Sequence, residues 1–231
     1  MKLALDINYK HIVMISIPLI LSLFTHLYNP EGFPCNFYDE GVYLRRALYV
    51  LDNGSPQDPS SRFDHGQGST SSYDHPHFAQ LLLAGIFKMI GYPSSLNPVP
   101  TIQSIEMLYT VPRVLMGLFA VVDTFLLYKI AEFRYDRRVA FIASILFAVM
   151  PITWFLRRVY LDSILMPFLL SSILFALYAM RWKKDVDADN NSSNLQSDKN
   201  VINQSRNIVI TTIVSGILLG IAIYTKIPAL T

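Results

Sequence analysis

Two adjacent carboxylates, Asp39 and Glu40, are the side chains whose types and spacing best suit chemistry. They open FYDEGVYLRRALYVL, residues 37–51, which follows shortly after a first apolar run. A carboxylate can take the proton from an attacking hydroxyl, and neighbouring cations can stabilise a departing phosphate. The same pair also suits a solvated cap at the start of a surface helix, and the residue types alone favour that simpler interpretation.

The elements that must position these carboxylates are apolar helices. Apolar residues make up 52% of the chain and charged residues only 16%. Several runs approach the roughly 20 apolar residues that a helix needs to cross a bilayer, and in hydrocarbon only a helix satisfies its own backbone groups. We therefore predict an all-α polytopic transmembrane helical bundle, a single membrane domain over residues 1–231. Its five spans are expected at residues 11–28, 110–129, 139–156, 160–180 and 207–225.

The distribution of Lys and Arg predicts an orientation. Segments 1–10, 129–138 and 181–206 hold 11 of the 19 cations, whereas the long loop 29–109 holds four. The positive-inside rule then places the N-terminus in the cytoplasm and the long loop outside. A net charge of +2 gives no argument for a nucleic-acid partner.

Two non-membrane segments have different expected structures. The outer loop 29–109 contains mixed apolar and charged stretches at 41–51 and 77–91, which predict amphipathic surface helices. The inner loop 183–206 is polar and almost without aromatic residues, so we expect it to be disordered.

This topology gathers charged side chains at the outward ends of the spans. Charges at membrane depth are costly and are functional candidates by default, although cations at helix ends also serve as simple anchors. Their convergence on the side of Asp39 and Glu40 suits a reaction on an anionic, lipid-linked substrate. The residues concerned are Arg113, Arg157, Arg158, Asp162 and Lys226.

Other polar residues give weaker indications. Asp74, His75 and His77 lie together in the outer loop, but two histidines and one acid are a poor metal-ligand set. No metal ligand is therefore assigned and no cofactor is predicted with certainty; the need for a divalent cation stays open. Asp123, inside the second span, is expected to pair within the bundle or to lie near the inner interface.

FYDEGVYLRRALYVLDNG followed by YDHPHFAQLLLAGIFKMIG resembles the first outer loop of the type C glycosyltransferases. The similarity is to the protein O-mannosyltransferase and aminoarabinose-transferase group, whose loop begins with an Asp-Glu pair and later carries a His-Pro-Pro-Leu stretch. The following three predicted spans also look like that group. So do the spacing of Arg157 and Asp162 and the segment YTKIPAL, which resembles the Lys-containing end of a later span.

The resemblance implies transfer of a sugar from a polyprenyl-phosphate donor to an acceptor hydroxyl of a protein, lipid or glycan at the outer membrane face. Asp39 matches the family's catalytic base and Glu40 its acidic neighbour. Substrate-binding candidates are the remaining cations and acid together with the histidines, namely His75, His77, Arg113, Arg157, Arg158, Asp162 and Lys226.

Two features depart from the family pattern. His77 stands where the family has its second proline, and the chain ends at Thr231 whereas the family has further spans. We therefore expect an N-terminal part of such an enzyme. The alternatives are a transporter or lipid-binding membrane protein, and an inactive truncated relative that acts as a partner subunit.

Overall fold

A computed structural model describes residues 9–30, 32, 38–54, 76–92, 102–191 and 198–226. Every regular element within these ranges is a helix, which confirms the predicted all-α class. The elements are α1 (Tyr9–Leu27), α2 (Tyr38–Asn53), α3 (Phe78–Ile90), α4 (Ile102–Arg134), α5 (Arg137–Val149), the 3-10 helix η2 (Pro151–Arg157), α6 (Leu161–Asn191) and α7 (Asp198–Thr225).

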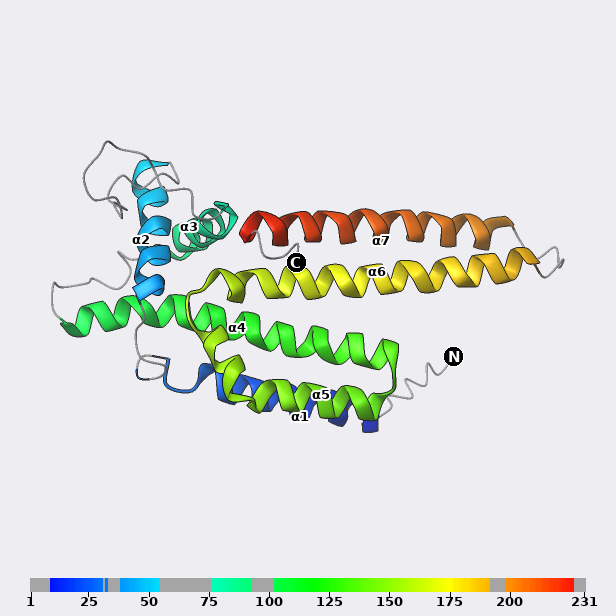
Figure 1. The fold of residues 1–231 in the computed structure, drawn as a ribbon, viewed down its shortest axis with the longest axis horizontal. Coiled ribbons are helices and arrows are strands. Elements are labelled where there is room, and N and C mark those ends of the chain that lie inside the picture. The colour runs from blue at the N-terminus through cyan, green and yellow to red at the C-terminus, as the bar shows by residue number, and fades with distance from the viewer. Residues whose placement is uncertain are drawn as a thin grey trace, which may run out of the picture.

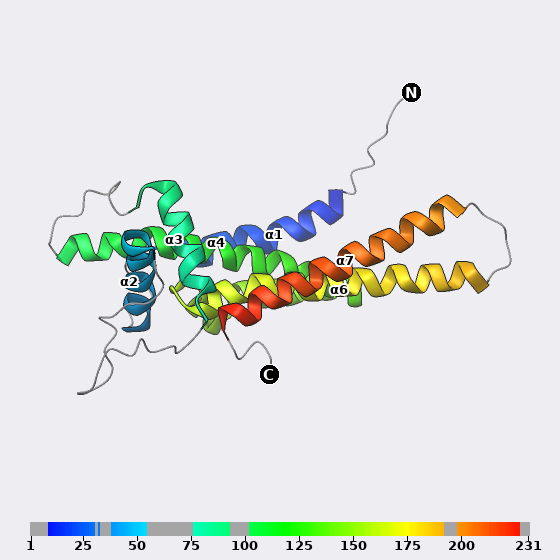
Figure 2. The same cartoon turned by 90° about the horizontal axis from the view of Figure 1, so that it is seen from above.

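Four of these helices are long and apolar enough to cross a membrane: α1, α4, α6 and α7. The pair formed by α5 and η2 passes the same test together, which makes up to five spans. Figures 1 and 2 show these helices running along the long axis of the molecule, with α2 and α3 lying across them near one end.

The third predicted span is not the single helix expected over 139–156. Its two parts are bent by 67° at Met150 and Pro151. Proline has no backbone N–H and disfavours helical geometry in the residue before it, and Met150 accordingly has an extended backbone with ψ 130°. Beyond the bend, η2 contacts α4 and α1.

Segment 183–206, which was expected to be disordered, is helical where the structure describes it; residues 192–197 lie outside the described residues. Residues 183–191 continue α6, and residues 198–206 lie in α7. Extending an existing helix fixes one residue per added hydrogen bond, without the cost of a new nucleus. The apolar parts of α6 and α7 therefore serve as nuclei from which the polar residues continue as helix.

Small and hydroxyl side chains join the spans. Ser22 of α1 lies 2.7 Å from the Thr124 hydroxyl of α4, and Thr25 donates to the Ala148 carbonyl of α5 at 2.8 Å. The hydroxyls of Ser172 and Ser215 donate to each other's carbonyls, both at 2.9 Å, and join α6 to α7. Such contacts are the usual means by which helices associate in lipid, where burial of apolar surface gives little driving force.

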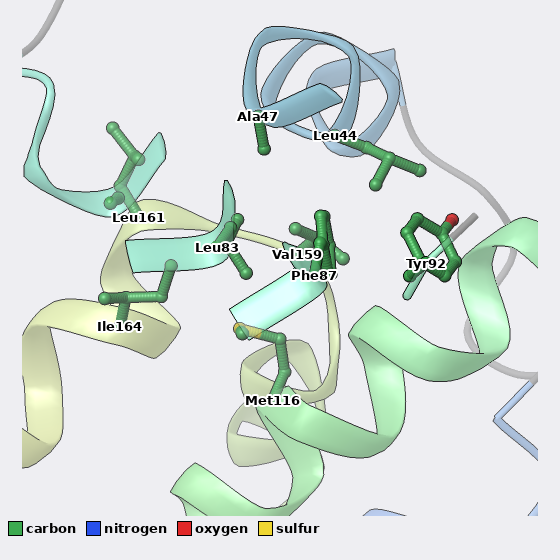
Figure 3. Close-up of a cluster of buried hydrophobic side chains, with 10 residues drawn as sticks. Leu44, Ala47, Leu83, Phe87, Tyr92, Met116, Val159, Leu161 and Ile164 are labelled. Carbon is green, nitrogen blue, oxygen red and sulfur yellow. The ribbon is translucent and has the colours of Figure 1, made fainter. Parts of the chain in front are cut away.

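A buried apolar cluster lies where the crossing helices meet the bundle (Figure 3). In α2 the inward positions recur at helical spacing, with Glu40, Leu44 and Ala47 all buried. The predicted surface helices are thus confirmed as helices, but α2 packs onto protein along this face. The cluster comprises Leu44, Ala47, Ala79, Leu83, Phe87, Tyr92, Met116, Val159, Leu161 and Ile164.

Candidate functional site

A buried ion pair joins α2 to α4 at this end of the bundle. The Arg113 guanidinium donates from Nη2 to Glu40 Oε2 at 2.7 Å and from Nε to Glu40 Oε1 at 3.1 Å. Both side chains are almost wholly inaccessible, at 1% for Arg113 and 0% for Glu40. Buried charges are tolerated only when they are paired and hydrogen-bonded, and this two-point contact meets both conditions.

Further hydrogen bonds join the pair to two other segments. The Val159 backbone N–H, between η2 and α6, donates to Glu40 Oε1 at 3.0 Å. Arg113 Nη1 donates to the Pro30 carbonyl at 2.9 Å, just after α1, and the guanidinium lies 5.6 Å from the centre of the Tyr109 ring. Glu40 and Arg113 therefore fix the first turn of α2 against the ends of three spans.

Asp39 has the opposite environment. It lies in the first turn of α2, beside Glu40 in sequence, and is exposed. Successive helical residues point about 100° apart, so burying Glu40 turns Asp39 away from the ion pair. A carboxylate at this position is favoured by the positive end of the helix dipole. The arrangement thus holds an accessible carboxylate on a rigidly attached helix.

Arg157, the last residue of η2, and Arg158, which follows it, make different contacts. Arg157 is buried, and its Nη2 donates to the Tyr28 carbonyl at the end of α1. Arg158 Nη1 donates to the Tyr160 hydroxyl at 3.1 Å, and its guanidinium lies 5.0 Å from the centre of the Phe155 ring. Arg157 therefore joins α1 to η2, and Arg158 lies between the rings of Phe155 and Tyr160.

Asp162 and Lys226 form a second ion pair. The Lys226 ammonium donates to both carboxylate oxygens at 2.8 Å and so joins the start of α6 to the end of α7. The pair is accessible, with 55% of the Asp162 side chain and 23% of the Lys226 side chain exposed. An accessible ammonium held in place in this way can also contact a ligand anion.

Of the two candidate histidines, His75 lies outside the described residues. His77 precedes α3, and partial burial together with the charge of Arg46 lowers its pKa below the usual 6.5. It is therefore mainly neutral at pH 7 and can donate or accept a hydrogen bond. In the part of the chain that the structure describes, no three His, Cys, Asp or Glu side chains gather as a metal site.

Sequence reasoning did not predict that Asp39 and Glu40 differ in burial. Neither carboxylate oxygen of Asp123 has a hydrogen-bond partner within the described ranges, so pairing within the bundle, one of the two alternatives expected for it, is wrong. Gln80 of α3 is likewise buried with both amide atoms unpartnered there. The helical spacing of Glu40, Leu44 and Ala47 was a signal that would have identified Glu40 as inward-facing.

Comparison with known protein families finds one match in the chain. Residues 105–187 match the model of the dolichyl-phosphate-mannose-protein mannosyltransferase family. The match includes Arg113, Arg157, Arg158 and Asp162 and ends before Lys226. No curated protein and no solved structure matches the chain. The resemblance to this glycosyltransferase group is therefore confirmed over residues 105–187, whereas Asp39 and Glu40 precede the matched stretch.

Proposed function

From the mannosyltransferase-family match at residues 105–187, we propose that the chain transfers a sugar from a polyprenyl-phosphate donor to an acceptor hydroxyl at the extracytoplasmic membrane face. The single observation that carries the proposal is the contrast between the two acids of α2. The carboxylate oxygens of Glu40 already accept hydrogen bonds from Arg113 and from the Val159 N–H, while Asp39 beside it is exposed. A general base needs this combination of a fixed backbone and a free carboxylate.

In the proposed reaction Asp39 takes the proton of the acceptor hydroxyl. The hydroxyl oxygen forms a bond to the anomeric carbon as the bond from that carbon to the phosphate oxygen breaks. The electron pair of the broken bond stays on the polyprenyl phosphate, which leaves with added negative charge. Attack from the face opposite the phosphate inverts the anomeric centre.

Cations at the same end of the bundle would stabilise the departing phosphate. Lys226 suits this role because it is accessible and is positioned by Asp162. Arg158 is a second candidate, since it is only half-buried and lies just after η2, between two aromatic rings. Arg113 and Arg157 are buried, and we assign them to holding the helices that carry the site.

The proposal is tested by reconstituting the full chain into vesicles with polyprenyl-phosphate mannose labelled in the sugar. Acceptor peptides rich in Ser and Thr, a lipid acceptor and a glycan acceptor are supplied separately. We expect label to enter one acceptor class with release of an equal amount of polyprenyl phosphate. Label that crosses the bilayer with the donor intact would instead show a transporter, and an intact donor with every acceptor would contradict the enzyme.

A further inference from the structure

The corner between α4 and α5 lies at the ends of these helices away from α2 and α3 (Figure 1). Its surface is rich in basic side chains. The first turn of α1 reaches the same place, because the His11 ring lies 2.8 Å from Glu132 of α4. We call this surface the basic corner. Its cations are Lys10, Lys129, Arg134, Arg137 and Arg138.

The two acids of the basic corner, Glu132 and Asp136, already have hydrogen-bond or ion-pair partners. Glu132 accepts from Lys129 at 2.6 Å and from Arg137 at 3.2 Å, in addition to its contact with His11. Asp136 caps α5 by accepting the backbone N–H groups of Arg138 and Val139, both at 2.8 Å. Among the described residues, five cations thus face two acids, which leaves three positive charges in excess.

Three of the cations have no ion pair with any residue that the structure describes. Lys10, Arg134 and Arg138 are exposed, and none has an ion-pair partner within the ranges that the structure describes. They come from three different helices but meet at one corner, because α1, α4 and α5 are joined there through Glu132. The corner is therefore a preformed surface with unmatched positive charge.

The side chains around the basic corner indicate how it is placed relative to the membrane. Directly beyond Arg138, α5 presents the exposed apolar side chains Val139, Ile142 and Leu146 along one face. Tyr135 beside them is 71% exposed, as is usual for an aromatic residue at a membrane interface. The unmatched charges consequently lie at the level where an apolar, membrane-facing surface ends.

We propose that the basic corner binds the headgroup of an anionic phospholipid in the leaflet that contacts this end of the bundle. Cations at the ends of spans attract negative lipid headgroups within about a Debye length, and the lipid's acyl chains would lie along the exposed face of α5. Phosphate alone would gain the charge contact without that apolar contact. The site is separate from the glycosyl-transfer site at the other end of the molecule.

The test uses the full chain in a nonionic detergent with an equimolar mixture of phosphatidylglycerol and phosphatidylcholine. Native mass spectrometry then measures which lipid stays bound. We expect the wild-type chain to retain phosphatidylglycerol with about tenfold preference, and millimolar inorganic phosphate to leave that preference intact. Equal retention of the two lipids by the wild-type chain, or displacement by phosphate alone, would overturn the proposal.

A matched pair of variants locates the site. The triple variant Lys10→Gln/Arg134→Gln/Arg138→Gln removes the unmatched cations and should reduce the preference to about unity. The control Lys183→Gln/Lys184→Gln/Arg206→Gln removes the same charge from the α6–α7 pair, which Figure 1 shows continuing past the corner. An equal loss in the control would show diffuse attraction to the whole basic end and would also overturn the proposal.

Discussion

Asp39 and Glu40 are neighbours in sequence with different structural roles. Glu40 lies in a wholly buried ion pair with Arg113 and accepts the Val159 N–H as well, while Asp39 is exposed in the same helical turn. Removing one member of a buried pair leaves the other charge without compensation. Substitution of Glu40 should therefore lower the stability of the protein, whereas substitution of Asp39 should leave it nearly unchanged.

We predict that Glu40→Gln destabilises the protein by about 3 kcal/mol or more, because it leaves the Arg113 guanidinium buried without a counter-charge. Thermal unfolding in a single detergent measures this loss. Asp39→Asn is the matched control and should change the stability by less than about 0.5 kcal/mol, since its side chain is exposed.

A double variant separates loss of the pair from general damage. Glu40→Gln/Arg113→Gln removes both charges and should recover part of the stability that Glu40→Gln loses. If Asp39→Asn were as destabilising as Glu40→Gln, or if the double variant were simply additive, the assignment of Glu40 as the buried partner would be wrong.

At the scale of elements, close approach of helices depends on one glycine. A Cβ atom at Gly117 of α4 would lie 2.7 Å from the His26 carbonyl oxygen and 2.6 Å from Leu27 Cδ2 of α1. Both distances are too short for real contacts, and the carbonyl belongs to a backbone that cannot rotate away. Gly117 therefore sets how closely α1 and α4 pack.

We predict that Gly117→Ala lowers the thermal stability by about 1–3 kcal/mol, because α1 must shift outward. Gly216→Ala in α7 is the control, since nothing lies within 4 Å of a Cβ there and alanine is the better helix former. Equal stability of the two variants in the same unfolding assay would refute close packing at Gly117.

Element positions could be predicted from the sequence where hydrophobicity alone decides them. Long apolar runs located α1, α4, α6 and α7 within a few residues at their apolar ends. The break at Pro151 was readable from proline chemistry but was overlooked within an uncharged run. The helical continuation through 183–191 and 198–206 was missed because composition does not report that a neighbouring span can nucleate a helix.

At the scale of the whole molecule, several of the candidate residues that the structure describes lie near one end of the bundle. Glu40, Arg113 and the start of α6 meet through Val159, and Asp162 meets Lys226. Which charges pair with which could not be predicted, because pairing depends on helix rotation and on contacts between segments far apart in sequence. The contact of Glu40 with Arg113, 73 residues later, is an example.

The measurement that tests the central claim most directly is sugar transfer by Asp39→Asn in the reconstituted vesicles. We predict a loss of about 100-fold or more in turnover, the usual contribution of a general base, with donor binding retained. Asp52→Asn, an exposed acid at the other end of α2, should transfer sugar at the wild-type rate. Wild-type turnover by Asp39→Asn would contradict the assignment of Asp39 as the base.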